Sequence, residues 1–223
     1  MRITALTLET VTQSATGAVE LVFAPKRPLP FRAGQGGLLG VPGGGVKPFT
    51  FASDDRSGRI SIATTLASGS RFKRAVGDLP LGGRAFTAGP IGTLPAIDPG
   101  ESQVLVAQGI GITPFLSMAR SHDSLNATLL QVGSRHYFDE VAAAMTAAEH
   151  HDHREGLADA VRLAITARPG ARWSLSGRPA FVAAVAAHLR EAGVPARSVH
   201  KDAFWGMGTT APSTDRRSAL PSR

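Results

Sequence analysis

The stretch VLVAQGIGITPFLSM, residues 104–118, decides how the second half of the chain is interpreted. A buried, strand-like run leads into Gly109, Gly111, Thr113 and Pro114, and a helical pattern follows. Glycines let a backbone turn sharply and approach a ligand, and the first turn of a helix offers free N–H groups to a phosphate. The spacing is not GxGxxG, so the motif alone fits phosphate binding and an ordinary strand–turn–helix equally well.

The same alternation of strand and helix continues toward the C-terminus. Strand-like runs are NATLLQV (126–132), AVRLAIT (160–166), RWSLS (172–176) and RSVHKDAF (197–204), and helical segments are expected at 138–149 and 179–191. Strands that alternate with helices of this length indicate βαβ units. The sequence therefore predicts an α/β domain with a parallel sheet.

The first ninety residues have a different pattern. Six short β-rich segments are expected at 2–11, 18–24, 36–42, 48–53, 59–64 and 85–89, separated by turn clusters such as PGGG and LASGS. Many short strands with little helix predict a small antiparallel β-barrel. The pattern changes at PAIDPGE, so we expect one domain over 1–97 and a second over 98–208. The polar, proline-broken tail, 209–223, is expected to be disordered.

Composition limits the function classes. The chain has no cysteine, which excludes disulfides, iron–sulfur clusters, thiolate zinc sites and a cysteine nucleophile within it. Any redox function would need a bound organic cofactor. No apolar run approaches the length of a membrane span and no signal peptide is recognisable, so we expect a cytoplasmic protein without a membrane span.

The net charge of +7 is uneven along the chain. Residues 1–97 hold eleven Lys and Arg against five Asp and Glu, whereas the remaining residues hold thirteen against twelve. A basic first half can attract a phosphate-bearing cofactor, an acidic protein or nucleic acid. No nucleic-acid recognition motif accompanies the charge, so nucleic acid is not expected as a partner.

Polar residues follow two of the predicted parallel strands. Ser134 and Arg135 come after the strand 126–132, where an arginine can bind a 2′-phosphate with two hydrogen bonds or can simply be a solvated turn residue. Ser176 and Gly177 come before a helix that begins with Pro179, a place suited to a cofactor ring but also to an ordinary helix start.

Two other kinds of site are not favoured by the sequence. His150, His151 and His153 are expected in a loop after the helix 138–149, without a second cluster that would complete a metal site, so no metal is predicted. The serines lack a nucleophile-elbow motif, which sets hydrolysis aside.

Six motifs in order, KPFT, GSRFKRAV, AGPIGTL, GIGITP, SLSGRP and KDAFWG, make the chain resemble the ferredoxin–NADP reductase family of flavoprotein reductases over residues 1 to about 208. The resemblance implies a flavin-binding barrel followed by a domain for a nicotinamide nucleotide. It also implies that Lys47, Pro48, Phe49 and Thr50 form the flavin-binding strand.

The resemblance assigns individual roles on that strand and near it. It implies that Lys47 neutralises flavin phosphate, that Phe49 packs on the flavin, and that the Thr50 hydroxyl reaches the reactive N5 edge. Gly69, Ser70 and Arg71 match the loop that holds the pyrophosphate. On the nicotinamide side the resemblance matches a second set, Gly109, Gly111, Thr113, Pro114, Ser176 and Gly177, to which Ser134 and Arg135 are added by their position after a parallel strand.

The sequence departs from the family pattern at several of these positions. Lys47 replaces arginine and Phe49 replaces tyrosine, which removes a guanidinium fork and a phenol hydroxyl. The family's Cys-Gly-Pro becomes Ser176-Gly177-Arg178-Pro179. Asp202 is the candidate for the family's acidic residue near the C-terminus. Phe204 and Trp205 are expected near the flavin, with Trp205 covering the face that the nicotinamide must occupy.

The implied function is that of an FAD-dependent reductase. It would take hydride from NADPH, or from NADH, with Thr50, Ser176 and Trp205 at the reacting groups, and would pass electrons to a small acidic carrier such as flavodoxin or ferredoxin. Two alternatives remain open: a reductase of free flavin or ferric chelates, and a non-catalytic subunit that binds flavin or nucleotide.

Overall fold

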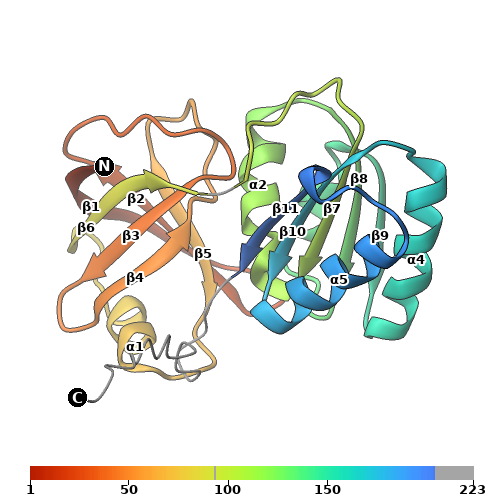
Figure 1. The fold of residues 1–223 in the computed structure, drawn as a ribbon. Helices are drawn as coiled ribbons and strands as arrows, with labels where there is room; N and C mark the ends of the chain where they lie inside the picture. Colours follow the sequence, from red (N-terminus) through yellow and green to blue (C-terminus); the bar gives the residue numbers. More distant parts are fainter. Residues whose placement is uncertain (93, 204–223) are drawn as a thin grey trace, which may run out of the picture.

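The N-terminal part of the chain folds into one six-stranded antiparallel sheet that curves into a half-barrel (Figure 1). The computed structural model describes residues 1–92 and 94–203. The strand order is β4-β3-β6-β1-β2-β5, so β4 and β5 are the edge strands. The elements are β1 (Arg2–Gln13), β2 (Ala18–Pro25), β3 (Gly36–Val41), β4 (Gly45–Thr50), β5 (Ile60–Thr65), α1 (Arg71–Gly77) and β6 (Arg84–Ile91).

The C-terminal part forms a five-stranded sheet in which every described pairing is parallel. Its strand order is β11-β10-β7-β8-β9. The strands are β7 (Gln103–Gln108), β8 (Leu125–Val132), β9 (Met145–His151), β10 (Arg172–Gly177) and β11 (Val199–Ala203), and the helices are α2 (Thr113–Ser121), α3 (Phe138–Ala142), α4 (Arg154–Ala167) and α5 (Pro179–Glu191), with short 3₁₀ turns η1 (Gly109–Ile112) and η2 (Ala196–Ser198). The predicted fold class is therefore confirmed.

The order of the parallel strands creates a switch point between β7 and β10. From β7 the chain first adds β8 and β9 on one side, and then crosses to add β10 and β11 on the other. In open parallel sheets, ligands bind beyond the carboxyl ends of the strands at such a point. Here these ends are the glycine turn after β7 and Ser176-Gly177 at the end of β10.

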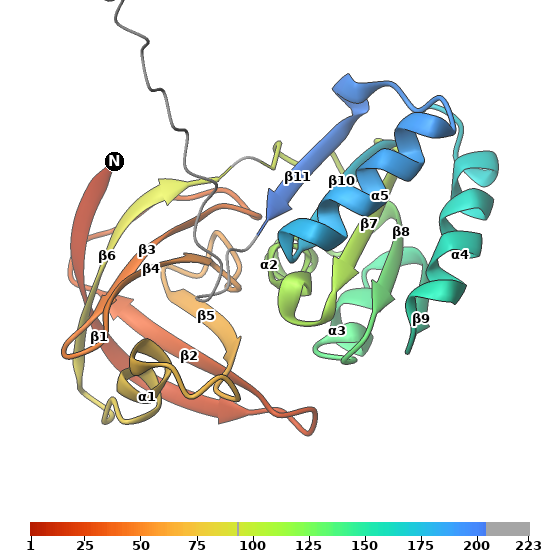
Figure 2. The ribbon, with the colours of Figure 1, turned by 60° about the horizontal axis from the view of Figure 1, so that its bottom comes forward.

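Alternate residues of β7 face two different buried clusters. Val104 and Val106 pack with residues of α4 and α5, whereas Leu105 and Ala107 pack with residues of α2 and α3. The second cluster also contains Ala33, Ala52, Ala63 and Leu94 from outside the parallel sheet, of which Ala63 lies on β5. Helix α2 therefore lies between the parallel sheet and the half-barrel, as Figure 2 shows.

One region of the second half is corrected by the structure. The predicted helix 138–149 is a short helix, α3, followed by the edge strand β9, and the predicted strand 160–166 is the second half of helix α4. The alanines of 142–148 favour helix in isolation, but pairing of β9 with β8 overrides that preference. The histidines consequently lie elsewhere than predicted: His150 and His151 belong to β9, and His153 precedes α4.

Smaller differences concern the half-barrel. The strand expected at 48–53 begins earlier and ends at Thr50, and helix α1 was not predicted. Helix α1 is short and is capped by the Ser70 hydroxyl, so it lacks the long periodic pattern by which helices are recognised.

Two kinds of feature are absent from the part of the chain that the structure describes. Within 1–92 and 94–203, no group of His, Asp and Glu side chains is arranged to hold a metal ion. In the same part of the chain, no helix has both the length and the apolar character needed to cross a membrane.

The helical assignment of 160–166 can be tested with two substitutions. A strand would place Val161 and Leu163 on one face, whereas in α4 Val161 is 2% exposed and Leu163 is 67% exposed. We expect Val161→Asp to destabilise the fold by about 3 kcal/mol or more, since it buries a charge, and Leu163→Asp to change stability by less than about 0.5 kcal/mol. Urea unfolding measures both, and similar losses would contradict the helix.

Candidate functional site

The two halves of the chain meet at the ends of β4 and β11. The Thr50 hydroxyl, on the last residue of β4, donates a hydrogen bond of 3.4 Å to Oδ2 of Asp202 on β11. Thr50 is buried and Asp202 is partly buried. Residues 152 positions apart are thus joined at the carboxyl ends of two strands from different sheets.

Asp202 is an unusual carboxyl group. Burial raises its pKa to about 6, although the hydrogen bond from Thr50 acts in the opposite direction. In the parallel ladder, Asp202 of β11 pairs with Ser176 of β10. Ser176 is fully buried, and its hydroxyl has no hydrogen-bond partner among the described residues. A buried hydroxyl without a partner is costly, so this position is suited to a polar ligand group.

The glycine turn after β7 packs directly against the end of β10. A Cβ on Gly111 would lie 2.7 Å from the carbonyl oxygen of Ser176 and 3.0 Å from the Cα of Gly177, so only glycine allows this approach. Gly109 has a positive φ of 51°. Helix α2 then begins at Thr113, with Pro114 in its first turn. The predicted residues of both loops are therefore brought together at the switch point.

The predicted flavin strand, β4, lies at the edge of the half-barrel. Lys47 and Phe49 are half-buried, while Pro48 is exposed and pairs with Leu38 of β3. The Phe49 ring stacks on Phe72 of α1, with centroids 5.5 Å apart and planes at 25°. Phe72 therefore covers part of the Phe49 ring surface that was expected to contact a flavin.

Lys73, on helix α1, lies beside the predicted flavin strand, and the sequence named it with Arg71 as a cation that could bind the flavin phosphate in place of Lys47. Its ammonium group lies 5.2 Å from the centroid of the Phe49 ring and donates to the Thr64 hydroxyl. Burial lowers the pKa of Lys73 to about 8. Its signal in the sequence was a cation in GSRFKRAV, three positions after the serine that caps α1.

The predicted pyrophosphate loop lies at the start of α1. Gly69 has a positive φ of 55°, and its Cβ position is open space. The Ser70 hydroxyl accepts a hydrogen bond of 3.3 Å from the Lys73 backbone N–H. Arg71 is exposed and donates through Nε to the Gly43 carbonyl at 2.6 Å. The loop thus presents cations, whereas its serine hydroxyl is already engaged by the helix.

Ser134 and Arg135 lie beyond the end of β8 and are both exposed. Arg135 forms an ion pair of 2.6 Å with Asp139 and lies 4.2 Å from the centroid of the Phe138 ring. Next to this turn is a pocket of about 300 Å³ at the carboxyl ends of β7 and β8 and the start of α4. It is lined by Gln108, Val132, Gly133, Asp152, His153, Arg154 and Glu155.

The arginine of this pocket is Arg154, which was not predicted as a site residue because 148–156 was expected to be a solvated loop, whereas in the structure α4 begins at Arg154. The remaining predicted site residues, Phe204 and Trp205, lie outside the described residues, and so does the tail 209–223.

The pKa of Asp202 leads to a prediction about stability and pH. Because burial raises this pKa from 3.8 to about 6, the folded protein favours the neutral carboxyl, so stability is lost as pH rises through this window. Asp202→Asn resembles the neutral form and can still accept from Thr50. We expect the variant's gain in unfolding free energy to be larger at pH 8 than at pH 4, by about 2 kcal/mol. Urea unfolding at both pH values measures it, and equal gains would contradict the buried carboxyl.

Comparison of the whole structure with solved proteins gives clear matches, whereas no protein-family model and no curated protein matches the sequence. A ferredoxin–NADP⁺ reductase from Neisseria gonorrhoeae with bound FAD and NADP matches 92% of this chain and 100% of its own, with a TM-score of 0.75 and 16% identity. A cytochrome P450 reductase from Amycolatopsis matches 91% of this chain and 70% of its own, with a TM-score of 0.72 and 23% identity.

The ferredoxin reductase of carbazole 1,9a-dioxygenase in its FAD-free form has a TM-score of 0.73 and 19% identity over 92% of this chain. The present chain spans 66% of that reductase's length. At such identities the likeness concerns the fold. The chain has the two-domain fold of the ferredoxin–NADP reductases, a half-barrel joined to a parallel five-stranded sheet.

Proposed function

We propose that the chain is an FAD-dependent reductase that takes hydride from NADPH, or from NADH, and passes electrons to a separate acceptor. The observation that carries the proposal is the contact of Thr50 with Asp202. It places the end of the predicted flavin strand against the carboxyl edge of the parallel sheet, where a nicotinamide would lie. The likeness in fold to a ferredoxin–NADP⁺ reductase solved with bound FAD and NADP supports it.

The residues at the half-barrel edge suit a flavin dinucleotide. Lys47 and Arg71 would neutralise its phosphates, and the half-buried Phe49 offers an aromatic surface. Lys73 places a further positive charge beside that ring. The flavin would supply hydride acceptance and single-electron transfer, which the side chains of this cysteine-free protein do not provide.

The parallel sheet would hold the nicotinamide nucleotide. Gly109 and Gly111 allow the close backbone approach that a pyrophosphate requires, and the N-terminus of α2 adds free N–H groups. The buried Ser176 hydroxyl, which has no hydrogen-bond partner among the described residues, would bind a polar group of the ring. The pocket beside Arg154 would take the other end of the molecule.

Thr50 and Asp202 would hold and transfer a proton at the place where the two halves meet. With a pKa near 6, the Asp202 carboxyl can hold or release a proton close to neutral pH. The Thr50 hydroxyl both donates and accepts hydrogen bonds, so with FAD bound it would pass a proton to or from Asp202.

The acceptor that we propose is a small acidic electron carrier such as ferredoxin or flavodoxin. Residues 1–97 hold eleven basic residues against five acidic ones, which favours association with an acidic surface. Two of the matched structures are named as a ferredoxin reductase and a cytochrome P450 reductase.

The function is tested by loading purified protein with FAD and adding NADPH without oxygen. We expect flavin absorbance that NADPH bleaches. Colour without bleaching would favour a binding subunit, absence of colour would overturn the proposal, and turnover with free flavin or ferric chelates but without a carrier would identify a different reductase.

Two variants should separate binding from reduction. Lys47→Ala should weaken FAD binding by about 1–3 kcal/mol, because a charge-assisted contact to phosphate is lost. Thr50→Ala should keep FAD but slow its reduction by about tenfold or more. Thr16→Ala is the matched control, since Thr16 also donates or accepts across the two halves, at 2.8 Å from His136 Nδ1. Equal FAD affinity and equal reduction rate in the Lys47 and Thr50 variants would contradict the assignment.

The choice between NADPH and NADH is tested at Arg135. If it leaves Asp139 to bind the 2′-phosphate, Arg135→Ala should raise the KM for NADPH by about tenfold and leave that for NADH unchanged. Arg162→Ala is the control, because Arg162 is also exposed and also forms an ion pair with an aspartate, Asp159. An effect of Arg154→Ala alone would assign the phosphate to the pocket instead.

A further inference from the structure

One face of helix α2 is bonded to the segment that follows the predicted flavin strand. The Ser117 hydroxyl donates to the Ser53 carbonyl at 2.8 Å, and the Ser121 hydroxyl accepts from the Asp55 backbone N–H at 3.1 Å. Arg120 donates to the Ala52 carbonyl at 3.0 Å. Residues 117, 120 and 121 share one face of a helix, so a single face makes all three contacts.

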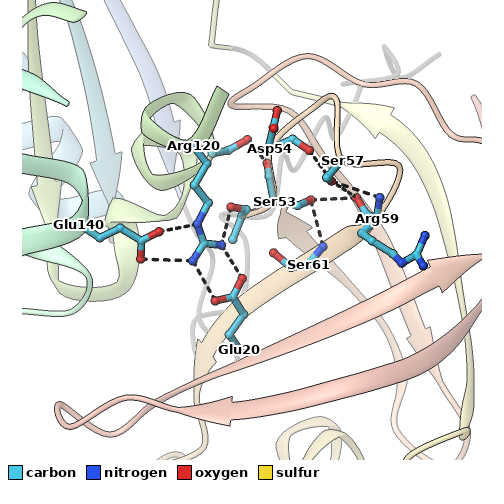
Figure 3. Close-up of polar contacts among 10 residues, drawn as sticks. Glu20, Ser53, Asp54, Ser57, Arg59, Ser61, Arg120 and Glu140 are labelled. Atoms are coloured by element: carbon cyan, nitrogen blue, oxygen red, sulfur yellow. Dashed lines mark hydrogen bonds and ion pairs between the residues drawn. The ribbon is translucent and has the colours of Figure 1, made fainter. Parts of the chain in front are cut away.

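Arg120 extends this contact to two carboxylates, which Figure 3 shows on either side of its guanidinium group. It binds both oxygens of Glu20, at 2.5 and 3.1 Å, and both oxygens of Glu140, at 2.7 and 3.2 Å. Glu20 lies on β2 of the half-barrel, whereas Glu140 lies on α3, in the same half as Arg120. The ion pair with Glu20 therefore joins the two halves of the chain, whereas the ion pair with Glu140 lies within one half.

The contact between Arg120 and Glu20 is partly buried, which strengthens it. The Glu20 side chain is 12% exposed and that of Arg120 is 24% exposed. Burial alone lowers the pKa of Arg120, but the hydrogen bonds to Glu20 and Glu140 outweigh it and raise the pKa above its ordinary value. A partly buried, two-point arginine–carboxylate contact is directional, unlike the apolar packing of Ala52 and Ala63 beside it.

The position of these contacts along the chain gives them a role. Segment 52–55 begins two residues after the end of β4, which carries Lys47, Phe49 and Thr50, and α2 directly follows the glycine turn 109–112. The two predicted cofactor segments are therefore connected through one helix face. Hydride transfer requires donor and acceptor atoms to approach within about 3–3.5 Å, and small displacements are costly in rate.

We propose that Arg120, through its bond to Glu20, is a positioning residue that sets how the nicotinamide lies over the flavin. The inference rests on the proposed function, and it assigns control of the transfer geometry to a residue outside the cofactor-binding segments. It predicts that loss of the ion pair with Glu20 slows hydride transfer, whereas loss of the ion pair with Glu140 lowers only the stability of the fold.

The matched variants are Glu20→Gln and Glu140→Gln, which each remove one carboxylate from the same guanidinium group. Both should lower the unfolding temperature. Only Glu20→Gln should slow flavin reduction at saturating NADPH, by about tenfold, while FAD affinity stays unchanged. The absorbance band from charge transfer between nicotinamide and flavin should be weaker in this variant. Equal reduction rates in the two variants would overturn the proposal.

A second readout needs no cofactor. Because the chain has no cysteine, Leu81→Cys and Leu163→Cys introduce one labelling site in each half, at side chains that are 68% and 67% exposed. Spin labels there should report a narrow distance distribution in the parent protein and with Glu140→Gln, and a broadened or shifted one with Glu20→Gln. If Glu20→Gln does not fold, Ser117→Ala replaces it and should give a smaller change of the same kind.

The two readouts separate the possible failures. If the protein takes up no flavin but Glu20→Gln alters the label distances, the proposed reductase function fails while the positioning contact stands. If the distances are the same in all variants, Arg120 does not set the orientation of the halves, and the proposal is overturned whatever the flavin results.

Discussion

The arrangement of this protein depends on one apolar layer that both halves of the chain share. Ala52 and Ala63, from the half-barrel side, belong to the same buried cluster as Phe115 and Leu116 of α2 and Leu105 of β7. The small alanine side chains let helix α2 approach the strands closely. Without this layer, Thr50 and Asp202 would not meet, and neither the shared site nor the contacts of Arg120 would form.

The site combines a fully buried hydroxyl with a carboxyl whose pKa lies near neutrality. Ser176 and Asp202 are ladder partners on adjacent parallel strands, and Thr50 reaches Asp202 from the other sheet. Each strand ends at this point, so backbone groups and side chains converge there without needing a long loop. Such convergence at a switch point is a general property of open parallel sheets, and here a second sheet closes it from one side.

The fold class could be predicted from the sequence because both periodicities are local. In β2 the side chains alternate between partly buried and buried from Glu20 to Ala24, and 179–191 carry a helical pattern. The segment 142–148 was wrongly predicted as helix because alanine favours helix, whereas the competing strand pairing with β8 depends on residues about twenty positions away. The glycine turn was recognisable as a candidate loop. The contact of Thr50 with Asp202 was not predicted, since it joins different sheets.

The position of Pro48 has a consequence for association between chains. Strand β4 is an edge strand, and an edge with a complete row of N–H donors can pair with a strand of another molecule. Proline has no N–H, so the row is interrupted in the middle of β4, between Lys47 and Phe49. The segment predicted to bind the cofactor is thereby also a poor template for β-aggregation, and it can remain open at the sheet edge without recruiting a second strand.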